Sequence, residues 1–191
     1  MTKGRLEAFS DGVIAILITI MVLELRAPAD TTLAALSPLV PVLLSYVLSF
    51  VFLGIYWSNH HHLIQAAKVV DGRVLWANLH LLFWLSLVPF GTAWMGQHGF
   101  APIPTALYGV PLTMAGAAYF ILVRALIAAP GQTESLAAAI GSDRKSKLSI
   151  AAYVVAIPIA FLAPYGSVAI YVAVAAFWFV PDRRMERALG R

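Results

Sequence analysis

Hydrophobic positions along the chain form six long apolar segments, separated by short breaks that are polar or rich in proline and glycine. The segments cover residues 9–25, 39–57, 75–95, 105–128, 148–163 and 167–180. A helix needs about 20 apolar residues to cross the hydrocarbon core of a membrane, and the segments lie close to that length. The last two are separated only by Pro164, Tyr165 and Gly166, which predicts a tight antiparallel helical hairpin. The pattern predicts an all-α membrane protein with six transmembrane helices, forming one domain over residues 1–191.

The composition excludes an ordinary soluble enzyme. Hydrophobic residues make up 61% of the 191 residues, charged residues make up 12%, and the mean hydropathy is +0.83. A soluble domain carries about 25% charged residues, so this chain lacks the charge to cover a surface in water, and it is too apolar to be disordered. The absence of cysteine excludes disulfide scaffolds and thiol-based sites. In a membrane protein the net charge of +4 does not indicate a nucleic-acid partner, and none is expected.

The basic residues indicate how the six expected helices are oriented. With six spans, each of the 13 lysine and arginine residues except Arg26 falls on the same side of the membrane. The residues on that side are Lys3, Arg5, Lys68, Arg73, Arg124, Arg144, Lys145, Lys147, Arg183, Arg184, Arg187 and Arg191. Because basic loops remain on the cytoplasmic side, both termini are expected to be cytoplasmic.

Two of the ionisable residues near the start of the first segment are candidates for a role in structure or function. Arg5 and Asp11 are six positions apart, which is about 240° around a straight helix, so they do not face each other. One interpretation is that Arg5 anchors the membrane interface while Asp11 caps the helix. The other is that both belong to a charged network between helices. The residues alone leave both open.

Two stripes continue along the first segment. A stripe of small residues, of the kind that allows helix backbones to approach closely in lipid, lies at Gly12, Ala15 and Thr19. A stripe of bulky residues lies at Ile16, Ile20 and Leu23. By spacing alone the bulky stripe favours packing or lipid contact over a pore lining. A membrane threonine such as Thr19 also commonly bonds to its own helix backbone.

The second segment ends in three adjacent histidines, His60, His61 and His62. Neighbouring helical residues point about 100° apart, whereas helical zinc sites use i, i+4 pairs, so no metal site is expected. The open alternatives are a hydrogen-bonding partner for Asp11 or Arg5 at the same membrane face, or filling of the interface. Two polar residues near the start of the third segment are placed to join the same cluster: Asn78 and His80.

Sequence patterns typical of catalysis are missing. There is no Gly-x-Ser-x-Gly elbow, no phosphate-binding loop and no His-Glu-x-x-His pair, so the chain is not expected to be an enzyme. A proton-driven transporter is expected to carry a pair of carboxylates in the middle of its membrane spans. No apolar segment of this chain contains such a pair. A TVGYG carbonyl filter is missing as well.

The first segment resembles the signature of a known family. Arg5-x-x-x-Phe9-Ser10-Asp11 matches the R-x-x-x-F-S-D motif of the transmembrane protein 175 family, the lysosomal potassium channels and their prokaryotic relatives. Further positions that are similar to the family are residues 12–16, residues 19–25, Trp57 with the histidines after it, and Asn78. The resemblance extends over essentially the whole chain, with its most specific motifs in residues 5–25.

The resemblance implies a homotetramer in a prokaryotic cytoplasmic membrane, with the first helix of each subunit lining a central potassium-selective pore. In the family, bulky apolar side chains narrow the pore and a threonine layer contributes to selectivity. Those roles would fall on Ile16, Ile20 and Leu23 for the constriction and on Thr19 for selectivity. A polar network would join the first helix to the second and third, and its members here are Arg5, Phe9, Ser10, Asp11, Trp57, His60, His61 and Asn78.

The physical chemistry of a pore is consistent with these roles. An apolar ring can lose its water and act as a gate, and a ring of Thr19 hydroxyls can replace part of the hydration shell of potassium. Four copies of Glu24 would concentrate cations at the outer mouth, although Glu24 could equally pair with Arg26.

We therefore expect a channel that conducts potassium passively. Its partners are other copies of the chain and the lipid bilayer, its only ligands are the permeant potassium ions, and it has no cofactor and no resident metal. The alternative is a proton-coupled secondary transporter that uses Asp11 with His60, His61 and His62 and with His80. A membrane metalloenzyme is the least favoured class.

Overall fold

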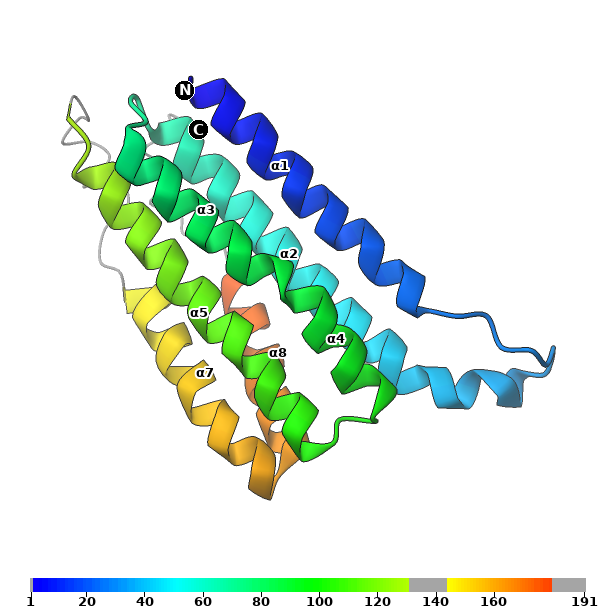
Figure 1. The fold of residues 1–191 in the computed structure, drawn as a ribbon. Helices are drawn as coiled ribbons and strands as arrows, with labels where there is room; N and C mark the ends of the chain where they lie inside the picture. Colours follow the sequence, from blue (N-terminus) through cyan, green and yellow to red (C-terminus); the bar gives the residue numbers. More distant parts are fainter. Residues whose placement is uncertain (1, 131–143, 180–191) are drawn as a thin grey trace.

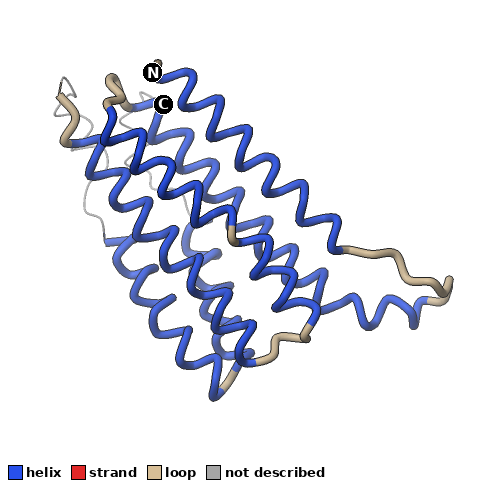
Figure 2. Tube along the Cα trace, in the orientation of Figure 1, coloured by secondary structure: helices blue, strands red, loops and turns tan. Residues whose placement is uncertain are grey.

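The computed structural model describes residues 2–130 and 144–179, and these residues form a bundle of long helices. Figure 1 shows that successive spans run in opposite directions, and Figure 2 shows that short connections join them. The elements are α1 (Lys3–Ile20), η1 (Met21–Glu24), η2 (Leu33–Leu39), α2 (Val40–Ala66), α3 (Gly72–Ser86), α4 (Val88–Gln97), α5 (Pro102–Ile127), α7 (Arg144–Leu162) and α8 (Pro164–Phe179). The expected all-α class is confirmed for the described residues.

Five spans in this part of the chain are long and apolar enough to cross a membrane. They are Lys3–Glu24, Leu33–Ala66, Gly72–Gln97, Pro102–Ile127 and Arg144–Leu162. The sixth, α8, is equally apolar but has only 16 residues. Only Ala163 separates α7 from α8, and the two helices pack along each other as the expected hairpin. The described residues therefore contain six apolar spans, and five of these meet the length needed to cross a membrane.

The third expected span is interrupted in the structure. α3 ends at Ser86 and α4 begins at Val88, so residues 75–95 do not form one regular helix. Pro89 has no backbone N–H to donate to the carbonyl of Leu85. The N–H of Leu87 donates to the carbonyl of Trp84 at 3.3 Å, which tightens the last turn of α3. The expected single helix is thus two helices that continue in the same direction (Figure 1).

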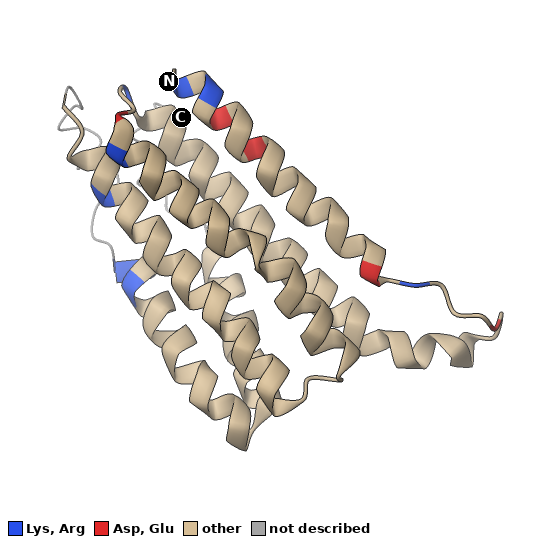
Figure 3. Cartoon of the chain, viewed as in Figure 1, with Lys and Arg blue, Asp and Glu red and all other residues tan. Residues whose placement is uncertain are grey.

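Charged residues gather at one end of the bundle. Figure 3 shows lysine and arginine at the end where α1 begins, while the middle of the bundle carries no charge. The described basic residues at that end are Lys3, Arg5, Lys68, Arg73, Arg124, Arg144, Lys145 and Lys147, and Arg26 follows the opposite end of α1. The expected basic tail, Arg183, Arg184, Arg187 and Arg191, lies outside the described residues. The described basic residues other than Arg26 thus share one end of the bundle, and the cytoplasmic location of that end stays a prediction.

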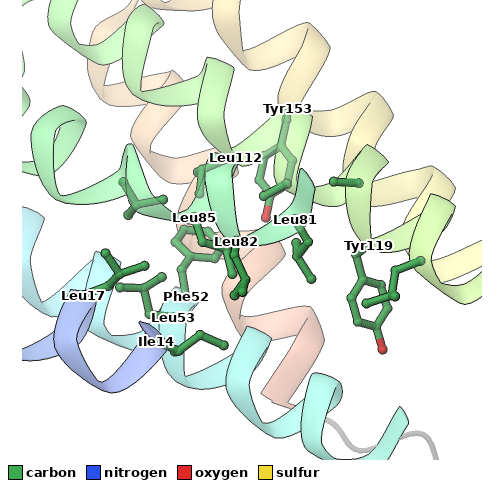
Figure 4. Close-up of a cluster of buried hydrophobic side chains, with 14 of the residues drawn as sticks. Ile14, Leu17, Phe52, Leu53, Leu81, Leu82, Leu85, Leu112, Tyr119 and Tyr153 are labelled. Atoms are coloured by element: carbon green, nitrogen blue, oxygen red, sulfur yellow. The ribbon is translucent and has the colours of Figure 1, made fainter. Parts of the chain in front are cut away.

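The core runs through the bundle and includes buried side chains of α1, α2, α3, α4, α5, α7 and α8. Figure 4 shows Ile14 and Leu17 of α1 beside Leu53 of α2, and the leucines of α3 pack behind them. Because lipid is as apolar as these side chains, helix association inside a membrane depends on close packing and hydrogen bonds rather than on the expulsion of water. The position of α1 therefore depends on shape complementarity and on its polar contacts.

Close packing between α2 and α4 leads to a first prediction. A Cβ added at Gly96 would meet Ser45 Oγ and would lie 2.9 Å from the Cα of Val42. Gly96→Ala is expected to destabilise the bundle by about 1–3 kcal/mol, because α4 must move away from α2. The effect is measured as a lower midpoint of thermal unfolding in detergent. Gly54→Ala is the matched control, since nothing lies within 4 Å of its added Cβ, and equal losses in both variants would contradict the tight contact.

Candidate pore helix and its polar anchor

α1 lies along one edge of the bundle and has two different faces (Figure 1). Its buried face packs on α2, α3 and α4 and consists of Leu6, Ser10, Ile14 and Leu17, continued by Met21 in η1. The spacing of three or four residues keeps these side chains on one side of the helix. The exposed face carries Phe9, Gly12, Ala15, Ile16, Thr19, Ile20 and Leu23. Residues 2–130 and 144–179 provide no cover for this face.

The bulky and the small stripes of the sequence are neighbouring parts of this one exposed face. Ile16 is 59% exposed, Ile20 is 41% exposed and Leu23 is 73% exposed, so none of the three belongs to the core of the described bundle. Gly12 and Ala15 are exposed beside them. The face thus has room for another helix to approach and side chains large enough to close a gap between helices.

Thr19 is the one hydroxyl on the exposed face of α1 among the described residues. Its Oγ1 donates a hydrogen bond to the carbonyl of Ile16 at 2.9 Å, as membrane threonines commonly do. A hydroxyl oxygen keeps two lone pairs when its proton is used in this way. The Thr19 oxygen therefore remains able to accept a cation or a water molecule.

A buried chain of hydrogen bonds joins α1 to α3 and α2. The amide nitrogen of Asn78 on α3 donates to Ser10 Oγ at 2.9 Å, and Asn78 Oδ1 lies 2.7 Å from His60 Nε2 on α2. Since the amide oxygen can only accept, His60 donates through Nε2. All three side chains are fully buried. In an apolar environment such bonds fix both the rotation and the height of α1 against its neighbours.

Two further pairs join α1 to α2 closer to the charged end of the bundle. Trp57 Nε1 donates to Asp11 Oδ1 at 3.0 Å, and His61 Nδ1 lies 3.1 Å from Glu7 Oε1. The rings of Trp57 and His61 are stacked, with centroids 5.9 Å apart. The structure thus brings together six residues of the predicted network: Ser10, Asp11, Trp57, His60, His61 and Asn78.

Other predicted residues lie apart from this network. Arg5 and Phe9 are exposed, and within the described residues the Arg5 side chain makes no hydrogen bond or ion pair, while its backbone N–H donates to the carbonyl of Thr2. His80 accepts a hydrogen bond from Trp84 Nε1 on its own helix at 2.9 Å. The ring of His62 packs edge-on against His61, with centroids 5.8 Å apart.

Sequence reasoning missed two residues that form polar contacts between the first span and its neighbours, Glu7 and Gln97. Glu7 faces His61, and its position four residues before Asp11, on the same side of the helix, is a signal that could have identified it. At the other end Gln97 Nε2 of α4 donates to Glu24 Oε2 at 2.8 Å. Nothing in the sequence indicates Gln97. Among the described residues Glu24 makes no ion pair with Arg26, the alternative that the sequence left open.

Comparison with known proteins shows a consistent set of relatives. Residues 5–89 match the family model described as endosomal/lysosomal potassium channel TMEM175. A potassium channel of Chryseobacterium sp. (strain P1-3) is 52% identical over 189 residues, which is 99% of this chain and 98% of that protein. The human endosomal/lysosomal proton channel TMEM175 is 39% identical over 96 residues, covering 44% of this chain and 19% of the human protein.

A solved structure agrees with the fold. The crystal structure of a lysosomal potassium-selective channel TMEM175 homolog from Chamaesiphon minutus superimposes with a TM-score of 0.77 and 27% sequence identity. The superposition covers 93% of this chain and 96% of that chain. The similarity therefore includes the whole arrangement of helices and not only the motif in α1.

Proposed function

Because this chain belongs to the TMEM175 family, we propose that it is a potassium-selective channel of a prokaryotic cytoplasmic membrane. Four copies surround a central pore, and α1 of each copy lines it. The observation that carries the proposal is the full-length similarity to a potassium channel. The exposed apolar face of α1 supports the assignment of the pore helix.

The exposed face of α1 has the features that a pore without a carbonyl filter requires. Four copies of Ile16, Ile20 and Leu23 form apolar rings, and such rings lose their water and block ions when the pore is narrow. When the channel opens, the rings become wider, or α1 rotates so that these side chains no longer point into the pore. Conduction is passive, so the direction of flow follows the potassium gradient and the membrane potential.

Thr19 supplies the selective layer in this proposal. Four hydroxyl oxygens at one level replace part of the hydration shell of a potassium ion, which gives up water more easily than sodium does. The bond from Thr19 to the carbonyl of Ile16 fixes the hydroxyl proton on the helix side. The oxygen lone pairs then face the ion path.

Thr19→Ala is expected to reduce the preference for potassium over sodium while the tetramer stays intact. The substitution removes the only side-chain oxygen on the exposed face of α1 among the described residues but no contact with α2, α3 or α4. The measurement is the reversal potential with potassium on one side of a bilayer and sodium on the other. Thr113→Ala is the control, because that hydroxyl bonds to the carbonyl of Gly109 within α5. An unchanged reversal potential for Thr19→Ala would show that another part of the pore provides the selectivity for potassium over sodium.

The buried anchor and the exposed motif residues have separate roles in the proposal. Ser10, Asn78 and His60 hold α1 on its own subunit, whereas Arg5 and Phe9 are exposed and contact a neighbouring copy. Glu24, tied to Gln97, places a carboxylate at the outer end of the pore. Four such carboxylates raise the local concentration of cations.

Flux from liposomes tests the function. Purified protein is reconstituted, and potassium efflux is measured from potassium-loaded vesicles with equal pH on both sides. Sodium-loaded vesicles, which report sodium efflux, and protein-free vesicles are the controls. The proposal predicts passive potassium flux that exceeds sodium flux and needs no proton gradient. Potassium movement only under an imposed proton gradient would indicate a proton-coupled carrier. Passive proton flux without potassium flux would indicate the activity named for the human relative.

A further inference from the structure

Glu7, Asp11 and His61 form a cluster between α1 and α2 at the charged end of the bundle. Glu7 and Asp11 lie four residues apart on α1, and His61 faces them from α2. One ligand atom from each residue lies within 4.8 Å of the other two. We call this group the carboxylate–histidine cluster. It is separate from the exposed face of α1, to which the proposed pore belongs.

The contact between Glu7 and His61 does not have the geometry of a hydrogen bond. His61 Nδ1 is shielded from solvent and makes no hydrogen bond, although Glu7 Oε1 lies only 3.1 Å away. Two ligand atoms that each lie about 2.1 Å from one tetrahedral zinc ion are about 3.4 Å apart. The observed separation of 3.1 Å is close to this value, so a small outward shift of either side chain lets both atoms bind one ion in place of their direct ion pair.

The ligands are already oriented by their neighbours. Trp57 Nε1 donates to Asp11 Oδ1 at 3.0 Å and leaves Oδ2 available. The indole of Trp57 also stacks on the His61 ring at 5.9 Å and fixes the plane of the imidazole. Hydrogen bonds and packing of this kind around ligands raise metal affinity by restricting the ligands before the ion arrives. Modest rotation of Asp11 brings the third oxygen into range.

We propose that the carboxylate–histidine cluster binds one divalent transition-metal ion, with Zn²⁺ as the representative of the class. One imidazole nitrogen and two carboxylate oxygens suit Zn²⁺, Co²⁺ or Mn²⁺, whereas Mg²⁺ and Ca²⁺ prefer oxygen ligands alone. All three residues are partly exposed, so water completes the coordination. The site does not consist of adjacent histidines. It combines His61 of α2 with two carboxylates of α1.

The consequence of binding is a crosslink between α1 and α2. The buried chain of Ser10, Asn78 and His60 lies next to the cluster along both helices. An ion bound there adds a bond between helices at the end of α1 where the pore would open to the cytoplasm. Binding itself does not depend on the proposed channel function, and it is tested without measuring flux.

Calorimetric titration of Zn²⁺ into purified, tag-free protein in detergent tests the proposal. The expected result is one Zn²⁺ per chain, with an affinity at least about tenfold weaker in Glu7→Gln and in His61→Asn, since losing one of three protein ligands commonly costs that factor or more. His98→Asn is the control, because His98 is exposed at the opposite end of the bundle. Elution as the native oligomer in size-exclusion chromatography verifies the fold of each variant.

A substitution that exchanges one ligand for another tests the same site while keeping three protein ligands. Glu7→His replaces an oxygen ligand by nitrogen, so the visible ligand-field spectrum of bound Co²⁺ should shift while the stoichiometry stays at one ion per chain. Unchanged Zn²⁺ affinity in both Glu7→Gln and His61→Asn would overturn the proposal. So would an equal loss in His98→Asn, or a Co²⁺ spectrum that is identical in Glu7→His and the parent.

Discussion

Ile20→Asn is expected to raise the basal potassium flux of the channel by about tenfold or more. Ile20 belongs to the exposed face of α1 and is 41% exposed in the described chain. In the proposed tetramer four isoleucines would form an apolar ring that water leaves readily. Four amides keep water in the ring, and lowering the barrier to an ion by only about 1.4 kcal/mol gives a tenfold higher rate. Ile16→Asn is expected to act in the same direction.

Liposome flux normalised to the amount of reconstituted protein measures this effect. Ile121→Asn is the matched control, because Ile121 is 46% exposed but lies on α5. It should conduct as the parent does. If Ile16→Asn and Ile20→Asn both conducted at the parental rate, the apolar face of α1 would not form the constriction, and another face would have to line the pore.

Asn78→Ala is expected to lower the stability of the subunit by about 1–3 kcal/mol, because buried partners lose their hydrogen bonds. Asn78 is fully buried and contacts Ser10 on α1 and His60 on α2. The His60 ring then has no partner for Nε2 in an apolar environment, and α1 loses its link to α3. We expect a lower unfolding midpoint together with more dissociated protein in size-exclusion chromatography.

Asn59→Ala provides the comparison for this effect. The Asn59 amide donates to the carbonyl of Ile55 within α2, so its removal breaks no contact between helices through that side chain. Its unfolding midpoint should stay close to that of the parent. A drop in Asn78→Ala no larger than in Asn59→Ala would show that the buried chain of hydrogen bonds does not anchor α1.

Much of the fold was predictable because it depends on local patterns. Apolar segments of membrane length and Pro164 as a boundary led to the helices and to the α7–α8 hairpin. The interruption at Leu87 was not predicted, since Pro89 alone permits either a kinked helix or two helices. Packing against neighbours decides between them, and packing is not visible in one segment.

The sequence predicted which residues belong to the candidate site, but it did not predict which of them contact each other. The motif and its resemblance indicated Ser10, Asp11 and Asn78, whereas the contact of Ser10 with Asn78 depends on how α1 and α3 are rotated against each other. The same rotation places Glu7 against His61. Sequence reasoning considered Asp11 and Arg5 as hydrogen-bonding partners of the histidines, but as metal ligands it compared the adjacent histidines only with one another.

The central claim is that the exposed face of α1 lines the potassium pathway, and cysteine modification tests it most directly. The chain contains no cysteine, so Leu23→Cys carries a unique thiol, which is labelled in detergent with a cationic methanethiosulfonate before reconstitution. Leu162→Cys on α7 is the control, because both leucines are highly exposed, at 73% and 89%. Labelled Leu23→Cys should lose most of its potassium flux while labelled Leu162→Cys keeps it. Full labelling of Leu23→Cys, verified by mass, with undiminished flux would contradict the account.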